Sequence, residues 1–168
     1  MVNLYLKPIV QTLISKSRDV KHLILLDRDG TLNRDYGYTF KLIDLQVLYK
    51  NLDIIKEFIS DKSLIVCISN QSGIGRGYFS ALDATTFNLE LASNLSNYGL
   101  PIDIFYMCPH TPNSFCLCRK PGTLMIEMAL DLSRVSIEQS IFFGDSEVDR
   151  IASEKMGIKF IKIPKNNV

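Results

Sequence analysis

Five short apolar runs have the length and composition of buried β-strands. Residues 22–26 read HLILL and residues 64–68 read LIVCI. Apolar runs of this length, bounded by polar or turn residues, are typical of strands that are covered on both faces. The predicted strands are residues 22–26, 64–68, 102–107, 140–143 and 158–163.

The segments between these strands have the periodicity and the end signals of helices. Ser80 followed by Asp83 resembles a capping box, and Asn51 is a predicted N-cap. Gly99 and Gly157 are typical stops after a helix C-terminus. The predicted helices are residues 51–60, 80–97, 121–132 and 147–156.

Strands that alternate with helices predict a parallel sheet with helices on both faces. The expected fold is a single Rossmann-like, three-layer α/β domain over residues 1–168, with a parallel sheet of about five strands. No repeat or linker divides the chain, and no insertion is large enough for a cap domain. Residues 1–20 alternate apolar and charged positions, and we expect them to form an N-terminal amphipathic helix.

Polar clusters follow three of the predicted strands, at residues 27–31 (DRDGT), 69–73 (SNQSG) and 144–146 (GDS). The carboxyl ends of parallel strands meet at one edge of a sheet, where open α/β sheets bind ligands. Carboxylate oxygens suit Mg²⁺, and a carboxylate can also attack a phosphoryl group. The sequence therefore predicts a site for phosphate and a hard cation at this edge.

Asp27 and Asp29 are separated by one residue on a turn that contains Gly30. In such a pair, one carboxylate can attack while the other acts as general acid and then as general base. The alternative is that both aspartates only cap the next segment. The complete string DRDGT after four apolar residues makes this alternative the weaker one.

The overall charge provides no field that attracts nucleic acid or an anionic membrane. The chain has 19 Lys and Arg against 18 Asp and Glu, which gives a net charge of +1. No apolar run is long enough to span a membrane, and residues 1–20 lack the apolar block and cleavage site of a signal peptide. We therefore expect a cytoplasmic protein without nucleic-acid or membrane partners. The ligand expected for the predicted phosphate site is a small phosphorylated metabolite, and we expect the protein to be a monomer.

Three of the four cysteines fall in one short stretch with a histidine. In a reducing compartment this clustering indicates a metal site rather than disulfides. A Cys₃His set is enough for a closed, structural zinc site, although four unrelated residues are the alternative. Cys67 has apolar neighbours within a strand, and we expect it to belong to the core. The predicted zinc ligands are Cys108, His110, Cys116 and Cys118.

Four motifs together resemble those of the haloacid dehalogenase superfamily. They occur in the order of the family, and the resemblance covers nearly all of residues 22–163. The motifs are DRDGT at 27–31, Ser69 within SNQSG, Lys120 within CRKP, and the pair Asp145 and Asp149 within GDSEVD.

The resemblance implies a Mg²⁺-dependent phosphatase that forms an aspartyl-phosphate. Asp27 would be the nucleophile and a magnesium ligand. Asp29 would be the acid and base, and would contact Mg²⁺ through its backbone carbonyl. Asp145 would complete the magnesium site. Ser69 and Lys120 would hold the phosphoryl oxygens, because charge spreads over these oxygens during transfer.

Two further polar residues have alternative roles. Asn70 would orient either the acid and base or the substrate. Asp149 would be a partner of the metal or of Lys120, and a surface salt bridge is an equal alternative for it.

Within the superfamily, the chain resembles the branch of D-glycero-D-manno-heptose 1,7-bisphosphate 7-phosphatases and histidinol-phosphate phosphatases. Both carry a CPH…CxCRKP loop, as at residues 108–121 here. Residues 33–38 resemble the NxDxGY substrate loop of the heptose enzymes, and residues 69–77 resemble their TNQSGIARG. The implied substrate-binding residues are Asp35, Tyr36, Gly37, Tyr38, Asn70, Gln71, Ser72, Arg119 and Ser146.

These motifs make removal of the 7-phosphate of D-glycero-D-manno-heptose 1,7-bisphosphate the first expectation. Two departures favour the alternative, which is histidinol phosphate or another small sugar phosphate. The loop between His110 and Cys116 is short, and Ser146 stands where both relatives usually have a basic residue. A second phosphate would then need Arg34, Arg76 or Arg119 as its cation. Functions of other classes are a non-catalytic zinc-bearing module and a DNA 3′-end phosphatase. The intact motifs argue against the former, and the near-neutral charge argues against the latter.

Overall fold

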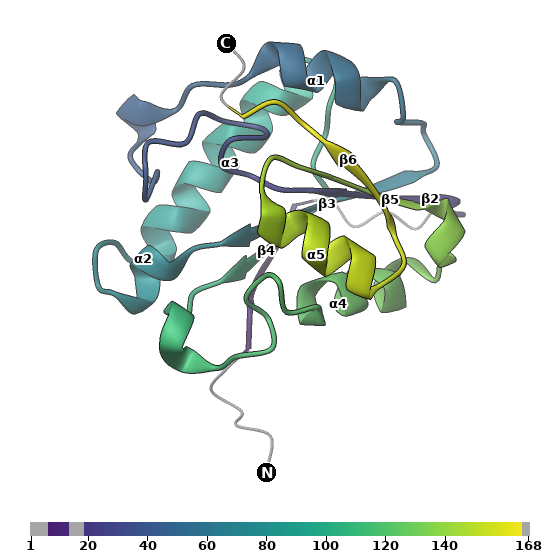
Figure 1. The fold of residues 1–168 in the computed structure, drawn as a ribbon. Helices are drawn as coiled ribbons and strands as arrows, with labels where there is room; N and C mark the ends of the chain where they lie inside the picture. Colours follow the sequence, from purple (N-terminus) through teal and green to yellow (C-terminus); the bar gives the residue numbers. More distant parts are fainter. Residues whose placement is uncertain (1–6, 14–18, 166–168) are drawn as a thin grey trace.

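The computed structural model describes residues 7–13 and 19–165, which form a six-stranded sheet with helices on both faces (Figure 1). The strand order is β1-β4-β3-β2-β5-β6. β1 pairs antiparallel with β4, and all other neighbours are parallel. The strands are β1 (Ile9–Thr12), β2 (His22–Leu26), β3 (Ser63–Asn70), β4 (Ile104–Cys108), β5 (Ser140–Gly144) and β6 (Lys159–Lys162). The predicted fold class is confirmed, with six strands rather than about five.

The helices follow the predicted alternation with the strands. Ser80 and Asp83 form the predicted capping box at the start of α3, and Gly99 and Gly157 follow α3 and α5 with φ of +90° and +69°. The α-helices are α1 (Tyr49–Lys56), α2 (Ser72–Gly75), α3 (Ala81–Asn97), α4 (Leu124–Ser133) and α5 (Glu147–Lys155). Short 3-10 turns are η1 (Leu42–Asp44), η2 (Pro112–Ser114) and η3 (Ile137–Gln139).

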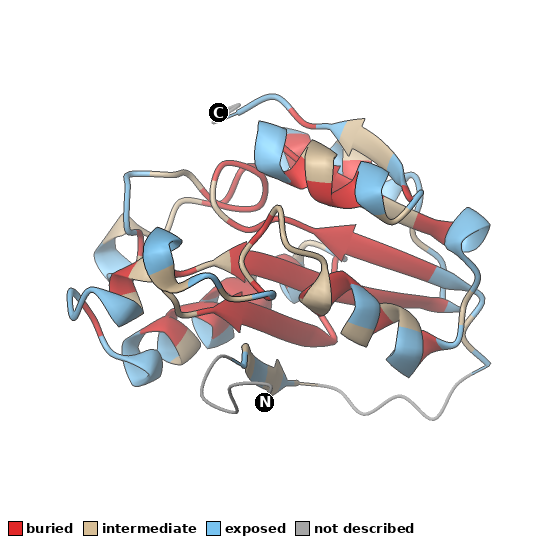
Figure 2. Cartoon of the chain, turned by 60° about the horizontal axis from the view of Figure 1, so that its bottom comes forward, coloured by how far each residue is buried: buried red, intermediate tan, exposed pale blue. Residues whose placement is uncertain are grey.

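The two faces of the sheet bury separate apolar clusters. Ile24 and Leu26 of β2 pack with α1 and α3, whereas Leu23 and Leu25 pack with α4 and α5. Side chains of a strand point alternately to opposite faces, so a strand covered on both sides must be apolar at every position. This explains the uninterrupted runs in the sequence, and the central strands are buried along most of their length (Figure 2).

The predicted N-terminal helix is wrong where the structure describes it, because Ile9–Thr12 form strand β1. Residues 1–6 and 14–18, which the prediction also covered, lie outside the described residues. Pro8 and the β-branched Ile9, Val10 and Thr12 favour an extended chain over a helix. β1 covers the edge of β4, which would otherwise expose unpaired backbone groups.

Asn51 is not the N-cap of α1, which begins at Tyr49 after Leu48. The Asn51 side chain is fully buried and donates to the carbonyl oxygens of Thr31 at 3.0 Å and Pro164 at 3.3 Å. It therefore ties α1 to the turn after β2 and to the segment after β6. This use of a buried amide is a tertiary contact, which local sequence patterns do not report.

None of the helices within residues 7–13 and 19–165 has the length and apolarity needed to cross a membrane.

Candidate active site

The three polar clusters predicted from the sequence meet at the carboxyl edge of the sheet. β2 lies between β3 and β5, and all three strands are parallel. Asp27 therefore stands beside Ser69 and next to Asp145. Carboxylate oxygens of Asp27, Asp145 and Asp149 lie within 4.8 Å of one another. Each of the three residues is at most 8% exposed, so this is a buried concentration of negative charge.

Lys120 supplies a buried cation to these acids. Its Nζ lies 2.5 Å from Asp27 Oδ1 and 2.6 Å from Asp149 Oδ1, and it also donates to the Ile68 carbonyl at 2.7 Å. Burial alone would lower the pKa of Lys120, but Asp149 and Asp27 outweigh it and raise that pKa above its ordinary value. Lys120 therefore stays charged, and Asp149 is a buried partner of Lys120 rather than a surface residue.

Burial makes the ionised form of these carboxyl groups unfavourable. Burial raises the pKa of Asp27 well above its ordinary value; Lys120 opposes this rise, while Asp149 and Asp145 add to it. Burial and Asp149 also raise the pKa of Asp145. One lysine therefore does not offset three clustered carboxylates, and a further cation would be favourable here.

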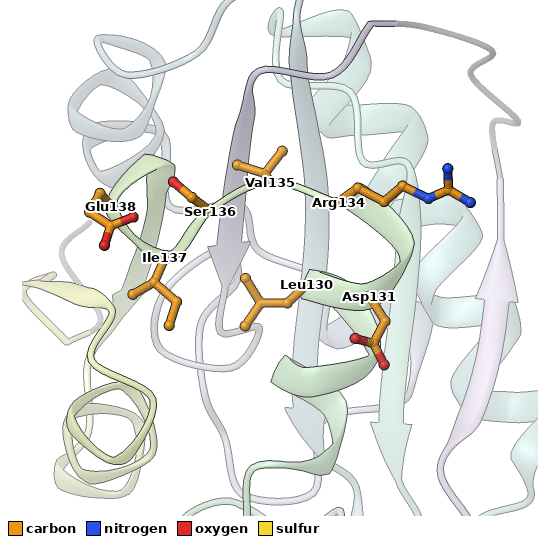
Figure 3. Close-up of a pocket in the computed structure, with 7 residues that line it drawn as sticks. All are labelled: Leu130, Asp131, Arg134, Val135, Ser136, Ile137 and Glu138. Atoms are coloured by element: carbon orange, nitrogen blue, oxygen red, sulfur yellow. The ribbon is translucent and has the colours of Figure 1, made fainter.

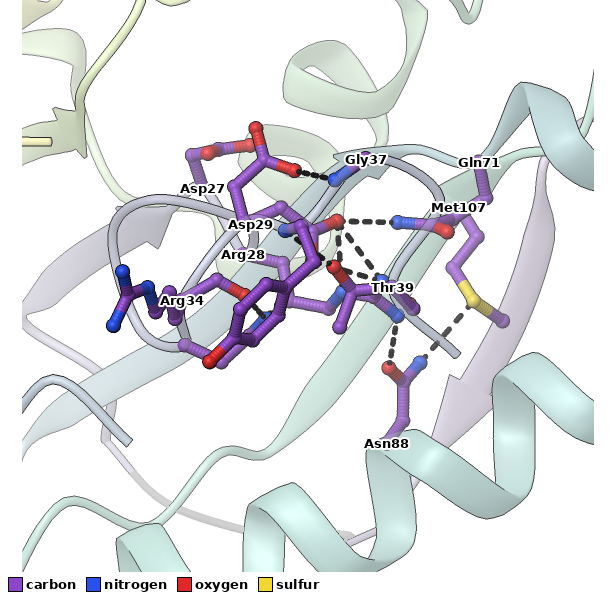
Figure 4. Close-up of polar contacts among 12 residues, drawn as sticks. Asp27, Arg28, Asp29, Arg34, Gly37, Thr39, Gln71, Asn88 and Met107 are labelled. Atoms are coloured by element: carbon purple, nitrogen blue, oxygen red, sulfur yellow. Dashed lines mark hydrogen bonds and ion pairs between the residues drawn. The ribbon is translucent and has the colours of Figure 1, made fainter. Parts of the chain in front are cut away.

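Asp29 lies beside this group and is held by nitrogen donors. Gln71 Nε2 donates to its Oδ2 at 2.9 Å and Asn33 Nδ2 to its Oδ1 at 3.0 Å. Arg28, which is fully buried, forms an ion pair with Asp29 at 2.9 Å (Figure 4). Arg28 had no predicted role, and Asn33 was predicted only as the first residue of the segment 33–38 that resembles the substrate loop.

Hydroxyl groups and amides complete this edge. Ser69 Oγ is buried and has no hydrogen-bond partner among the described residues. Asn70 exchanges two hydrogen bonds with the backbone of Lys120, at 2.9 and 3.0 Å, and so fixes the segment that carries the lysine. The Lys120–Pro121 peptide bond is cis.

The turn after β2 requires glycine at position 30. Gly30 has φ of +90°, which is unfavourable for other residues. A Cβ atom there would lie 2.5 Å from Asp145 Oδ2. The first and last motifs of the sequence are therefore in direct contact at this point.

The predicted zinc ligands form a second cluster beside the site. Cys108 Sγ lies 3.4 Å from His110 Nδ1 and 3.6 Å from Cys116 Sγ, and His110 Nδ1 lies 3.2 Å from Cys118 Sγ. Ligands arranged tetrahedrally around Zn²⁺ at about 2.0–2.3 Å are separated by roughly 3.3–3.8 Å. A hydrogen bond from Cys118 lowers the pKa of Cys108 to about 5, towards the thiolate form. Cys67 is fully buried in the core, as predicted.

The predicted substrate loop stands at the mouth of the site. Asp35 Oδ1 accepts a hydrogen bond from Gly37 N at 2.9 Å, and Tyr36 Oη donates to Gln46 Oε1 at 2.8 Å. The ring of Tyr38 stands edge-on to Tyr78, with centroids 5.0 Å apart. Three of these side chains, those of Tyr36, Tyr38 and Tyr78, are about half exposed and free to meet a ligand.

Lys165 is a cation at this mouth that the sequence reading missed. Its Nζ lies 3.1 Å from Asp35 Oδ2 and 3.8 Å from Asp145 Oδ2. The segment is fixed because Ile163 N donates to the Gly144 carbonyl at 2.8 Å, beyond the end of β6. No local signal marks Lys165, since its position depends on the pairing of β6 with β5.

Ser146 and Arg119 differ in their hydrogen bonding. The Ser146 hydroxyl contacts Asp149, and Ser146 N donates to Asp149 Oδ2 at 3.2 Å, at the start of α5. Arg119 Nη1 is buried without a hydrogen-bond partner among the described residues. Arg119 and Lys120 border a hollow of about 200 Å³ together with residues of the zinc loop.

A larger hollow lies away from these residues. It has a volume of about 570 Å³ and is formed where α4 ends and the chain turns through η3 into β5 (Figure 3). This is the amino end of β5, at the opposite edge of the sheet from Asp145. We therefore place the active site at the carboxyl edge, where the clustered acids and Lys120 lie, and not in this hollow. Its lining residues are Leu130, Asp131, Arg134, Val135, Ser136, Ile137 and Glu138.

Comparison with known proteins agrees with this geometry. The family model described as polynucleotide kinase 3 phosphatase matches residues 18–162. A match of this extent shows that the chain belongs to this family of haloacid dehalogenase-type phosphatases, which are phosphoric monoester hydrolases.

Individual relatives are described by a more specific activity. A Thermoplasma acidophilum protein, described as a probable D-glycero-D-manno-heptose-1,7-bisphosphate 7-phosphatase, is 40% identical over 138 residues, which cover 82% of this chain and 86% of the relative. The D-glycero-beta-D-manno-heptose-1,7-bisphosphate 7-phosphatase of Haemophilus ducreyi is 36% identical, with 83% and 80% covered. A crystal structure of D,D-heptose 1,7-bisphosphate phosphatase from B. bronchiseptica, in complex with magnesium and phosphate, is 29% identical with a TM-score of 0.78, and 87% and 82% of the two chains are covered.

Replacing Asp27 by Asn tests whether the site stores unfavourable charge. Because the pKa of Asp27 is raised in the folded state, its protonation stabilises the fold fully below the ordinary pKa of 3.8, and this contribution is lost as the pH rises through the folded-state pKa. The Asp27→Asn variant has no carboxyl group to ionise at this position, so it does not lose this stability as the pH rises. At pH 7 without Mg²⁺, we expect the variant to be more stable than the parent chain by about 1 kcal/mol or more, or roughly 2–4 °C in Tm.

Thermal unfolding of both proteins at pH 4 and pH 7 measures this difference. The exposed Asp131, replaced by Asn, is the control and should leave both values unchanged. Equal or lower stability of Asp27→Asn at pH 7 would show that Lys120 fully compensates the charge of Asp27.

Proposed function

We propose that the chain removes the 7-phosphate of D-glycero-D-manno-heptose 1,7-bisphosphate with the help of Mg²⁺ and through phosphorylated Asp27. The observation that carries the mechanism is the ion pair of Asp27 with the buried Lys120, beside Asp29. The substrate is supported by the names and the extent of similarity of the relatives.

In the first step, a carboxylate oxygen of Asp27 attacks the phosphorus atom. A bond forms between this oxygen and phosphorus, and the bond between phosphorus and the sugar oxygen breaks. Asp29 gives a proton to the departing sugar oxygen. Lys120 and the unpartnered Ser69 Oγ stabilise the charge on the phosphoryl oxygens.

In the second step, water replaces Asp27 on the phosphorus atom. Asp29 accepts a proton from the water as its oxygen bonds to phosphorus. The bond between phosphorus and Asp27 breaks, and the electron pair returns to the Asp27 carboxylate. The same residue serves as acid and then as base, so each turnover restores the starting protonation.

Mg²⁺ fits the clustered acids at this edge. The ligands that we propose are the carboxylates of Asp27 and Asp145 and the backbone carbonyl of Asp29. The fit follows from the raised pKa of both carboxyl groups, since one lysine does not offset the local negative charge. When bound, the ion supplies positive charge that lets an anionic phosphate approach these carboxylates.

Zn²⁺ fits the set of Cys108, His110, Cys116 and Cys118. Four protein ligands leave no position for a reacting water, so the role that we propose is structural. The bound ion would hold the loop that carries Arg119 and Lys120. The separations of the sulfur and nitrogen atoms support this proposal.

Phosphate release from a panel of substrates tests the function. With Mg²⁺ present, we expect kcat/KM for the heptose 1,7-bisphosphate to exceed that for histidinol phosphate, fructose 1,6-bisphosphate and a 3′-phosphorylated oligonucleotide by at least about tenfold. The oligonucleotide is included because the family model is named for polynucleotide 3′-phosphatases. Asp27→Asn should be inactive on every substrate, because it removes the carboxylate proposed to attack phosphorus.

Each other result would change the assignment. A preference for histidinol phosphate would make the short zinc loop and Ser146 the better guides to the substrate. A preference for the oligonucleotide would move the enzyme to nucleic-acid repair. Activity retained by Asp27→Asn would exclude the aspartyl-phosphate mechanism.

Removal of a zinc ligand tests the structural role of the loop. We expect the purified chain to contain one zinc ion and Cys118→Ser to lose it, which lowers Tm by roughly 5–10 °C, or about 2–3 kcal/mol. Metal analysis and thermal unfolding measure both effects. Cys67→Ala is the control, because it opens a core cavity but should retain zinc. A zinc-free parent chain of full stability would contradict the proposal.

Lys165→Met tests which cation meets the second phosphate. Lys165 stands at the mouth of the site, whereas Lys120 is buried and the Ser146 side chain contacts Asp149. A charge-assisted contact contributes about 1.5–3 kcal/mol, so we expect kcat/KM for the heptose bisphosphate to fall roughly tenfold or more.

Matched measurements distinguish a contact of Lys165 with the second phosphate from a general effect of removing a positive charge. Heptose 7-phosphate, which lacks the second phosphate, should be hydrolysed equally well by Lys165→Met and the parent chain. The exposed Lys162, replaced by Met, should have no effect on either substrate. An equal loss on both substrates would assign Lys165 to the reacting phosphate instead.

A further inference from the structure

Arg28 is an arginine with no solvent exposure at all, although it lies between the two aspartates of the first motif. An unpaired charge at such a position would be strongly unfavourable, so its partners must be permanent parts of the fold. Neither the attack on phosphate nor the binding of metal uses this side chain. Its burial therefore calls for a separate explanation.

The guanidinium group of Arg28 is fixed from three sides. Its Nη1 donates to Asn88 Oδ1 of α3 at 3.1 Å, and its Nη2 donates to the Thr39 carbonyl at 2.6 Å (Figure 4). Its Cζ lies 4.8 Å from the centroid of the Phe87 ring. Asn88 is itself held, because its Nδ2 contacts Met107 Sδ at 3.1 Å. Arg28 is thus anchored to a long helix and to the loop after β2.

The Nε and Nη2 side of the guanidinium group faces Asp29. Arg28 Nε donates to Oδ2 of Asp29 at 3.1 Å, and Nη2 lies 3.0 Å from Oδ1 and 2.9 Å from Oδ2. Gln71 and Asn33 add one N–H donor each. All five contacts come from nitrogen donors, so both oxygens of Asp29 accept. The Asp29 side chain is still 22% exposed, which leaves it accessible to water and substrate.

We propose that Arg28 is a positioning residue for the reaction: it fixes the orientation of the Asp29 carboxyl group, so that this group is in place to take a proton from water. This rests on the acid and base role proposed above for Asp29. In the second step, the water oxygen bonds to phosphorus, the bond from phosphorus to Asp27 breaks, and the water proton passes to Asp29. A carboxylate held by Arg28 does not have to be oriented anew in each turnover.

The shape of the side chain explains why arginine serves here. A planar guanidinium binds both oxygens of a carboxylate and still has an N–H group for Asn88. A lysine ammonium at this position would provide the charge without the fork. Arg28→Lys should therefore restore part of the function, and Arg28→Met none.

p-Nitrophenyl phosphate is the probe, because its leaving group needs no proton and the first step then bypasses Asp29. For Arg28→Met we expect kcat to fall about 100-fold, within the range for loss of a general base. We expect kcat/KM, which reports transfer to Asp27, to change less than about threefold. After acid quench, a larger fraction of the chain should carry phosphate on Asp27. Arg28→Lys should recover about tenfold in kcat.

A double-mutant cycle with Asp29→Asn separates positioning from damage to the fold. If Arg28 acts through Asp29, adding Arg28→Met to Asp29→Asn should lower kcat no further. A further loss of about 100-fold in the Asp29→Asn background would overturn the inference. So would a fall of kcat/KM equal to that of kcat, because the first step would then depend on Arg28 as well.

Controls keep the inference distinct from the proposed function. If Asp29→Asn keeps full kcat, the role of Asp29 is wrong; if only Arg28→Met keeps it, the inference alone fails. Arg150→Met removes an ion-paired arginine on the surface of α5 and should change nothing. Should thermal unfolding show that Arg28→Met does not fold, Asn88→Leu, which frees one arm of the fork, and Arg28→Lys enter the same cycle with the same criteria.

Discussion

The buried ammonium group of Lys120 joins the parts of the chain on which the site depends. It contacts Asp27 at the end of β2, the Ile68 carbonyl in β3 and Asp149 in α5. These three elements share no local sequence. Only a sheet with β2 between β3 and β5 brings them to one point. Because a buried cation without partners is strongly unfavourable, this contact links the correct assembly of the sheet to the completion of the site.

The position of Lys120 depends in turn on the cysteine loop. Cys118 stands two residues before Lys120 and is fully buried, and Asn70 binds the backbone of Lys120 on the other side. Phe115 and Leu117, the large apolar side chains of this loop, are exposed and add little packing to it. The proposed binding of Zn²⁺ to the Cys₃His set would stabilise the loop next to Lys120 with only a few residues.

The sequence predicted most of this architecture because its signals are local. Uninterrupted apolar runs identified five strands, and the polar residues that follow them predicted which edge holds the site. The four-residue strand Ile9–Thr12 was missed, since its pairing with β4 is a long-range contact. The contacts of Arg28 with Asn88 and of Lys165 with Asp35 were missed for the same reason. A linear pattern shows that a charged residue is present but not where its side chain points.

The buried cluster of acids is unfavourable for the stability of the fold, although the proposed function requires these acids. Burial raises the pKa of Asp27 and of Asp145, the neighbouring acids add to this rise, and a protonated Asp27 could not attack phosphorus. The proposed Mg²⁺ would resolve this conflict, because a bound cation favours the ionised form of these carboxylates and stabilises the fold by binding. Asp29 differs, because its cationic partner Arg28 is a fixed part of the fold. The proposed nucleophile would thus depend on an exchangeable cation, whereas the proposed base has a fixed one beside it.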